Sequence, residues 1–158
     1  MPGEAAQIAA VLDRIGRGVV ESLTGVPPAA LNQQIALPEA NSLFALATHL
    51  VGAGEFWVLT LAGGRDVDRD RAAEFAASGN FEQIAARYGR WLTAVHEVLD
   101  GLPGELLDRI AEPRATYRGT LGDAPMTLRE CLLHAVEHSA LHQGQIEITR
   151  QLLMSGKG

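Results

Sequence analysis

The amino-acid sequence predicts an all-α fold, with a four-helix bundle as the expected architecture. Four segments of about 20 residues carry apolar side chains at spacings of three and four. Glycine and proline separate these segments, and none of them shows the alternation of a β-strand. Four amphipathic helices can bury their apolar faces against one another, so the 158 residues are expected to form one domain, 1–158.

The first expected helix covers about Glu4 to Thr24 and the second about Asn41 to Ala62. Gly25 ends the first and Gly63-Gly64 ends the second, because glycine readily adopts the conformation that terminates a helix. The second helix is apolar nearly all round, which indicates deep packing. The charged stretch after it, Arg65 to Glu74, is expected to be a solvated loop with at most a short helical turn.

The third expected helix covers about Asn80 to Asp100 and the fourth about Thr127 to Met154. Asn80 suits an N-cap, and Thr127-Leu128-Arg129-Glu130 fits a capping box. The polar connection between these helices is expected to hold a short helix at Glu105 to Ile110 and an extended piece at Thr116 to Arg118. The long connections leave the topology of the bundle open.

Charge and composition exclude several classes of protein. The net charge is −6 with scattered acidic residues, whereas a nucleic-acid protein needs a basic stripe. Nor is there a basic cluster for an anionic membrane, or an apolar run of the roughly 18 residues of a membrane span. Cys131, the single cysteine, requires no oxidising compartment and is expected to be a buried apolar residue. The N-terminus lacks a signal-peptide pattern, so a cytoplasmic location is expected.

Three of the five histidines lie on the fourth expected helix at spacings of four: His134, His138 and His142. Each step of four residues turns a helix by a net angle of about 40°, so neighbours in this series share a face. A histidine pair at i and i+4 can bind one cation. The end members lie about 12 Å apart along the axis, too far for all three to meet one ion.

The apolar face of this helix favours His138 and His142 as the ligand pair, because His134 lies on its shoulder near Glu130 and Glu137. Another helix must supply a third ligand. His49 is the better candidate, within the most apolar helix, and His96 is the competitor. Three histidines and a water would leave an open position, as in catalytic sites.

Two other interpretations of the histidines stand beside this one. Single histidines on apolar faces are usually hydrogen-bonded core residues, and a solvent-facing triplet would bind no metal. Alternatively, His134-Ala135-Val136-Glu137-His138 matches the metallopeptidase motif H-x-x-E-H, with Glu137 as the base. Five-residue matches arise by chance, and the chain has no expected strand to align a peptide. That hypothesis predicts that His134, rather than His142, is essential for metal binding.

Two segments resemble motifs of the DinB-like superfamily. The segment from Leu133 to Ile146, LHAVEHSALHQGQI, resembles its last-helix signature of a histidine, then His-x3-His, then Gly-Gln and an apolar residue. The segment from Asn41 to Ala53 resembles its second-helix histidine motif. The resemblance implies a four-helix bundle with up-down-down-up connections. It also implies a divalent metal held by His49, His138 and His142, and a homodimer.

The resemblance also suggests a function. Characterised members include mycothiol-dependent maleylpyruvate isomerase and bacillithiol S-transferases, while many others have no established activity. The leading hypothesis is a metal-dependent enzyme acting on a small molecule with a low-molecular-weight thiol, an S-transferase or isomerase; a non-enzymatic metal- or ligand-binding stress protein is the alternative. Zinc or nickel is favoured as the metal, with iron or copper next.

One position departs from the family pattern. Many members have His-Arg-Gly-Gln where this chain has His142-Gln143-Gly144-Gln145, so an arginine that could hold an anionic ligand is missing. Gly144 is expected to permit close helix approach. Gln145 is either a hydrogen-bonding partner behind a metal ligand or a surface residue. No general base is identified, because Glu55 lies on another face from His49.

Overall fold

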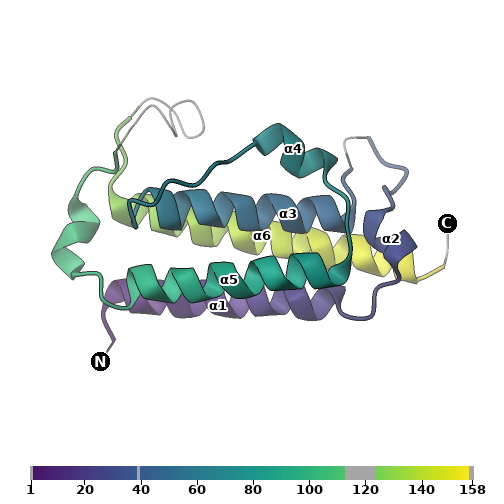
Figure 1. Cartoon of the computed structure of the whole chain (residues 1–158), viewed down its shortest axis with the longest axis horizontal. Helices are drawn as coiled ribbons and strands as arrows, with labels where there is room; N and C mark the ends of the chain where they lie inside the picture. The colour runs from purple at the N-terminus through teal and green to yellow at the C-terminus, as the bar shows by residue number, and fades with distance from the viewer. Residues whose placement is uncertain (1, 39, 113–123, 157–158) are drawn as a thin grey trace.

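The computed structural model describes residues 2–38, 40–112 and 124–156. Four long helices lie side by side along one axis (Figure 1): α1 (Glu4–Leu23), α3 (Leu43–Gly54), α5 (Phe81–Leu99) and α6 (Leu128–Met154). All four predicted helices are therefore present, and the described residues contain no β-strand, only an isolated bridge between Ile110 and Thr127. The predicted extended piece at Thr116 to Arg118 lies outside the described residues.

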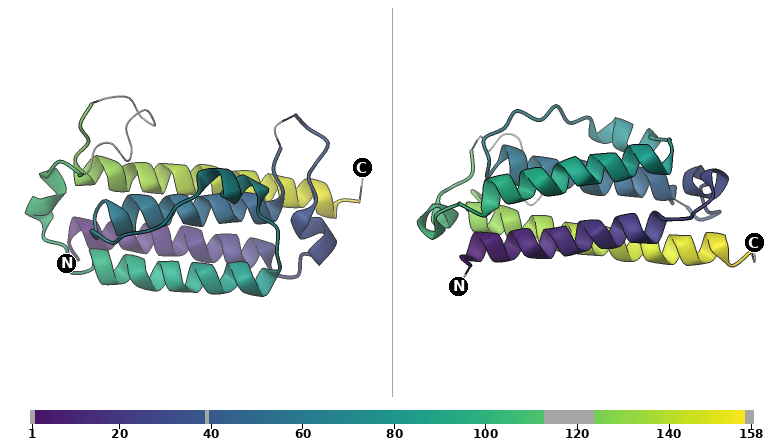
Figure 2. Two further views of the ribbon diagram at one scale, coloured as in Figure 1. Left: turned by 45° about the horizontal axis from the view of Figure 1, so that its top comes forward. Right: turned by 60° about the horizontal axis from the view of Figure 1, so that its bottom comes forward.

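The helices are connected in the up-down-down-up order that the resemblance implies. In Figures 1 and 2, α3 and α5 both run opposite to α1, and α6 runs in the same direction as α1. Because α3 and α5 are parallel, the chain between them must return along the length of the bundle. This crossover, residues 61–80, carries the short helix α4 (Arg71–Ala76) and packs it against α3.

The segment that leads from α1 to α3 contains a helix that sequence reasoning missed. Gly25 has a φ of 76° and turns the chain after α1, as predicted. Pro28 then begins α2 (Pro28–Asn32), because its fixed φ suits the first helical position. The Asn32 side chain bonds the backbone N–H and C=O of Gly79, each at 2.9 Å, and so fastens this segment to the start of α5.

The second predicted helix is present but not uniform. Ser42 caps α3 by accepting a hydrogen bond from the Ala45 N–H, and all twelve residues of α3 are buried. The helix changes to π-helical geometry in η1 (Glu55–Thr60), which spacing patterns do not reveal. The window Leu43–Thr60 is apolar enough to pass as a membrane span, contrary to our expectation. Since 83% of it is buried in the bundle, it is explained as a core helix.

The start signals of the last two long helices are confirmed. Asn80 and Thr127 each form a capping box with the residue three positions later, Gln83 and Glu130 respectively. The short helix predicted near Glu105 is the 3-10 helix η2 (Gly104–Asp108). These ends fix the register of α6, the helix that carries three of the histidines.

Candidate metal centre

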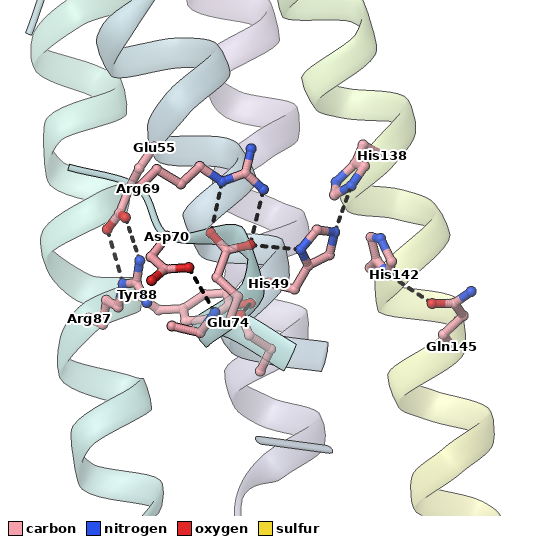
Figure 3. A network of polar contacts seen from close by, with 12 residues as sticks. His49, Glu55, Arg69, Asp70, Glu74, Arg87, Tyr88, His138, His142 and Gln145 are labelled. Atoms are coloured by element: carbon pink, nitrogen blue, oxygen red, sulfur yellow. Dashed lines mark hydrogen bonds and ion pairs between the residues drawn. The ribbon is translucent and has the colours of Figure 1, made fainter. Parts of the chain in front are cut away.

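The chain brings together the three histidines that the resemblance singled out. His49 on α3 faces His138 and His142 on α6, and one ring nitrogen from each lies within 4.8 Å of the others. The Nε2 atoms of His49 and His138 are 3.2 Å apart. Figure 3 shows the three rings converging between α3 and α6. Residues 89 positions apart in sequence thus form one cluster of nitrogen donors.

A buried carboxylate fixes the orientation of His49. The Nδ1 of His49 lies 2.8 Å from Oε2 of Glu74, and both side chains are at most 5% exposed. Burial alone would raise the pKa of Glu74, but hydrogen bonds from His49 and Arg69 outweigh it and lower this pKa to about 2. An ionised carboxylate can only accept, so His49 Nδ1 carries the proton. In the neutral ring with this tautomer, Nε2 carries the lone pair, and this atom faces Nε2 of His138.

Glu74 is itself held by Arg69. The guanidinium donates from Nε to Glu74 Oε1 at 2.8 Å and from Nη2 to Oε2 at 3.1 Å, a bidentate pair. Figure 3 shows the resulting chain of contacts from Arg69 through Glu74 to His49. The expectation of a solvated loop with at most a short helical turn holds for most of Arg65 to Glu74, since α4 is that turn, but it fails at Glu74, which is buried. The last residues of this stretch, with α4, cover the histidine cluster.

Local structure explains how Glu74 reaches His49. Asp70 caps α4 by accepting a hydrogen bond from the Ala73 N–H at 2.9 Å. Phe75, the next residue after Glu74, stacks on the His49 ring with 4.3 Å between centroids. On α3, Gly52 lies one turn beyond His49, and a Cβ at this position would overlap Oε1 of Glu74. Because Gly52 has no side chain, the carboxylate of Glu74 can occupy the space beside it.

The two histidines of α6 are held as neutral rings. Burial, with smaller contributions from the neighbouring His142 and His49, lowers the pKa of His138 to about 3. Burial and His49 also lower the pKa of His142. The Nδ1 of His142 lies 2.7 Å from Oε1 of Gln145, and because an amide oxygen only accepts, Nδ1 carries the proton. The lone pair of the neutral ring is then on Nε2, the atom left to bind a metal ion. Gln145, although exposed, is thus a hydrogen-bonding partner behind a candidate ligand.

The H-x-x-E-H interpretation is not supported by the geometry. His134 is outside the cluster and packs edge-on against Trp57, with 4.6 Å between ring centroids. Glu137 is 81% exposed and lies 3.7 Å from Nδ1 of His134, too exposed to serve as a base buried beside His138.

The remaining candidates lie elsewhere. His96 pairs with Asp13 of α1 and with Asp100, the residue that follows α5. Glu55 forms a bidentate ion pair with Arg87 and is not a neighbour of the three rings. A further expectation that fails concerns Gly144, which is exposed, and a Cβ at this position would meet no described atom outside its own helix within 4 Å. Gly144 therefore permits no close helix approach in the part of the chain that the structure describes.

The donor set fits a divalent transition metal. Two nitrogen atoms bound to one tetrahedral zinc ion are about 3.4 Å apart, close to the 3.2 Å between His49 and His138 Nε2. Metal-binding histidines usually donate their other ring N–H to a carboxylate or carbonyl oxygen. His49 does so to Glu74 and His142 to Gln145. The third nitrogen, within 4.8 Å of the others, needs only a small ring movement to join them.

A four-helix bundle with up-down-down-up connections and a histidine cluster between its second and last long helices defines the structural class. Residues 12–146, which include all three histidines, match the model of the DinB superfamily, and the chain belongs to this family. A search of curated proteins found no match.

Solved structures share the fold. A conserved protein from Enterococcus faecalis is 17% identical, with a TM-score of 0.74 and coverage of 98% of this chain and 99% of that one. A DinB-like protein from Bacillus cereus is 22% identical, with a TM-score of 0.66 and coverage of 87% and 85%. At these identities the similarity establishes the bundle and its connections.

Sequence reasoning missed the residues of the crossover that reach the cluster: Arg69, Glu74 and Phe75. A weak signal is present, since Asp70 suits an N-cap and is followed by a short alanine-rich turn bearing Glu74 and Phe75. That pattern predicts a helical turn, but it does not say which face of the bundle the turn covers.

Proposed function

We propose that His49, His138 and His142 bind one divalent metal ion, and that the chain is a metal-dependent enzyme acting on a small molecule together with a low-molecular-weight thiol, as an S-transferase or isomerase. The observation that carries this proposal is the convergence of three imidazole nitrogens within 4.8 Å, backed by the buried Glu74. The thiol chemistry rests on the family resemblance.

The protein's own residues would prepare the site. Glu74 holds the proton on His49 Nδ1, and Gln145 does the same for His142, so both rings direct Nε2 at the same space. The lowered pKa of His138 keeps its ring neutral at pH 7, as a metal ligand must be. A divalent ion with three histidine ligands and one open position lowers the pKa of a thiol or water bound there.

The aromatic surroundings limit access to this space. Phe75 covers one face of His49, and Trp57 packs against His134, one turn before His138. Trp57 is only 3% exposed, so this side of the site is largely closed to bulk water. A site of this kind favours small substrates over polymers.

The exposed face of α6 supports the homodimer implied by the resemblance. Leu141, Ile148 and Leu152 are 50 to 61% exposed and fall on one side of the helix at spacings of seven and four; we call them the α6 stripe. Exposed apolar patches mark interaction surfaces. We propose that a second copy of the chain covers the α6 stripe.

A screen of the metal-loaded protein against thiols and electrophiles tests the proposed activity. We expect thiol consumption with at least one electrophile, and loss of that activity in His138→Ala. Metal binding without turnover for any pair would instead favour a non-enzymatic metal-binding protein. Retention of full activity by His138→Ala would contradict the proposed site.

A further inference from the structure

We propose that Arg69 forms a binding position for the anionic group of a small ligand, a carboxylate or similar oxyanion, beside the three-histidine cluster. This inference rests on the proposed metal site, since the same ligand would contact both the metal ion and Arg69. It also answers a question raised by the sequence: α6 lacks the arginine that many relatives carry after the last histidine, and Gln143 stands there. The crossover brings a different arginine to the cluster.

The guanidinium of Arg69 keeps donors free after pairing with Glu74. An arginine offers five N–H groups, and the pair with Glu74 uses Nε and one hydrogen of Nη2. Nη1 makes no hydrogen bond to any described residue, and in Figure 3 it points away from Glu74. The Arg69 side chain is 18% exposed, so its unused N–H groups can donate hydrogen bonds to a ligand at little desolvation cost.

A continuous series of contacts places this guanidinium at the border of the site. From His49 the series passes through Glu74 to Arg69, whose Cζ lies 5.7 Å from the centroid of the Phe56 ring. Phe56 contacts Trp57, with 5.3 Å between ring centroids.

The series then returns to the cluster. Trp57 contacts His134 at 4.6 Å and His134 contacts His138 at 5.8 Å, both measured between ring centroids. His138 in turn faces His49. The contacts thus form a closed series of side chains, in which Arg69 is the cation and Phe56 and Trp57 are the aromatic members.

Charge balance favours an anionic ligand. The three imidazoles are neutral as ligands, and the charge of Glu74 offsets that of Arg69. A divalent ion would therefore bring two positive charges, and among the described residues no acidic side chain other than Glu74 contacts the three rings. The aromatic groups supply no negative charge, whereas the free guanidinium edge matches the geometry of a carboxylate. A ligand that carries a metal-binding atom and a carboxylate a few bonds apart could bind the metal ion with the first group and the Arg69 guanidinium with the second.

Two thiols of the same chain length, one ending in a carboxylate and the other in a neutral alcohol, test the inference. We would load the protein with Co²⁺ and measure, from the cobalt–thiolate absorption band, the Kd of 3-mercaptopropionate and of neutral 3-mercapto-1-propanol. The wild type is expected to prefer the carboxylate by about tenfold, as for a charge-assisted hydrogen bond. Arg69→Met should reduce this ratio to about one, and Arg69→Lys should restore part of it.

Glu74→Gln separates this role from a purely structural one. It removes the charge that neutralises Arg69 and keeps the guanidinium, so the preference for the carboxylate should persist or increase. As a control, Arg71→Met, in which the lost guanidinium lies over Phe75, should leave the ratio unchanged. A full preference in Arg69→Met, or an equal loss in Glu74→Gln, would overturn the inference. Failure of the wild type to bind Co²⁺ would overturn the proposed metal site as well, whereas Co²⁺ binding with no preference would overturn this inference alone.

Discussion

Glu74 and His49, 25 residues apart, are joined by a buried hydrogen bond of 2.8 Å between Oε2 and Nδ1. Replacing Glu74 by Ala removes the acceptor that orients the candidate ligand. We expect divalent-metal affinity to fall by about 10- to 100-fold, the usual effect of losing a hydrogen-bonded partner of a metal-binding histidine. Competition with a chromogenic chelator measures this affinity.

Glu137→Ala provides the matched control, because Glu137 is an acidic residue on α6 but is 81% exposed. Its metal affinity should equal that of the wild type. Equal affinities for the wild type and Glu74→Ala would show that the carboxylate has no part in the site.

Gly52→Ala tests the space that Glu74 occupies. Because a Cβ at Gly52 would overlap Glu74 Oε1, the variant must displace the carboxylate from His49. We expect weaker metal binding together with a loss of stability of about 1–3 kcal/mol, typical of overpacking. Thermal unfolding with and without metal measures both effects.

Gly89→Ala is the control for this substitution. Gly89 is a glycine within α5, and no described atom lies within 4 Å of a Cβ there. Alanine should stabilise the helix by about 0.5–1 kcal/mol and leave metal binding unchanged. Similar behaviour of the two variants would refute the role given to Gly52.

Cys131 should be unreactive in the folded protein. It is fully buried, and burial, with a smaller contribution from Glu130, raises the pKa of its thiol to about 11. At pH 8 only about a thousandth of such a thiol is thiolate, the reactive form. Labelling with a thiol reagent at pH 8 should be slow in buffer and rapid in denaturant. Rapid labelling of the folded protein would show that Cys131 is accessible and would make it a candidate nucleophile.

The α6 stripe should hold the proposed dimer together. A double change, Leu141→Glu with Ile148→Glu, places two like charges on the proposed interface and should give a monomer of unchanged helicity. Light scattering after size-exclusion chromatography measures the mass. Leu37→Glu alters an equally exposed leucine outside α6 and should leave the dimer intact. A monomeric wild type would contradict this assignment.

The sequence was sufficient for the long helices, because their apolar periodicity and capping residues are local features. Asn80 and Thr127 cap α5 and α6 as predicted. It was insufficient for the crossover. Glu74 looks like one more charge in a polar stretch, and its burial follows from the parallel order of α3 and α5, which no local pattern encodes.

The candidate site divides in the same way. Helical spacing predicts a histidine pair on α6, and the apolar face of that helix favours His138 with His142, whereas the choice of His49 over His96 required the resemblance. The structure adds the reason, since His49 faces α6 while His96 pairs with Asp13 on α1 and with Asp100 just after α5.

The metal content of the purified protein after dialysis tests the central claim most directly, with each histidine replaced in turn by alanine. We predict about one divalent ion per chain in the wild type and in His134→Ala. We predict little or none in His49→Ala, His138→Ala and His142→Ala, because each loses one of three ligands. Metal retained in full by a chain lacking all of His49, His138 and His142, or lost on replacing His134 but not His142, would contradict the account.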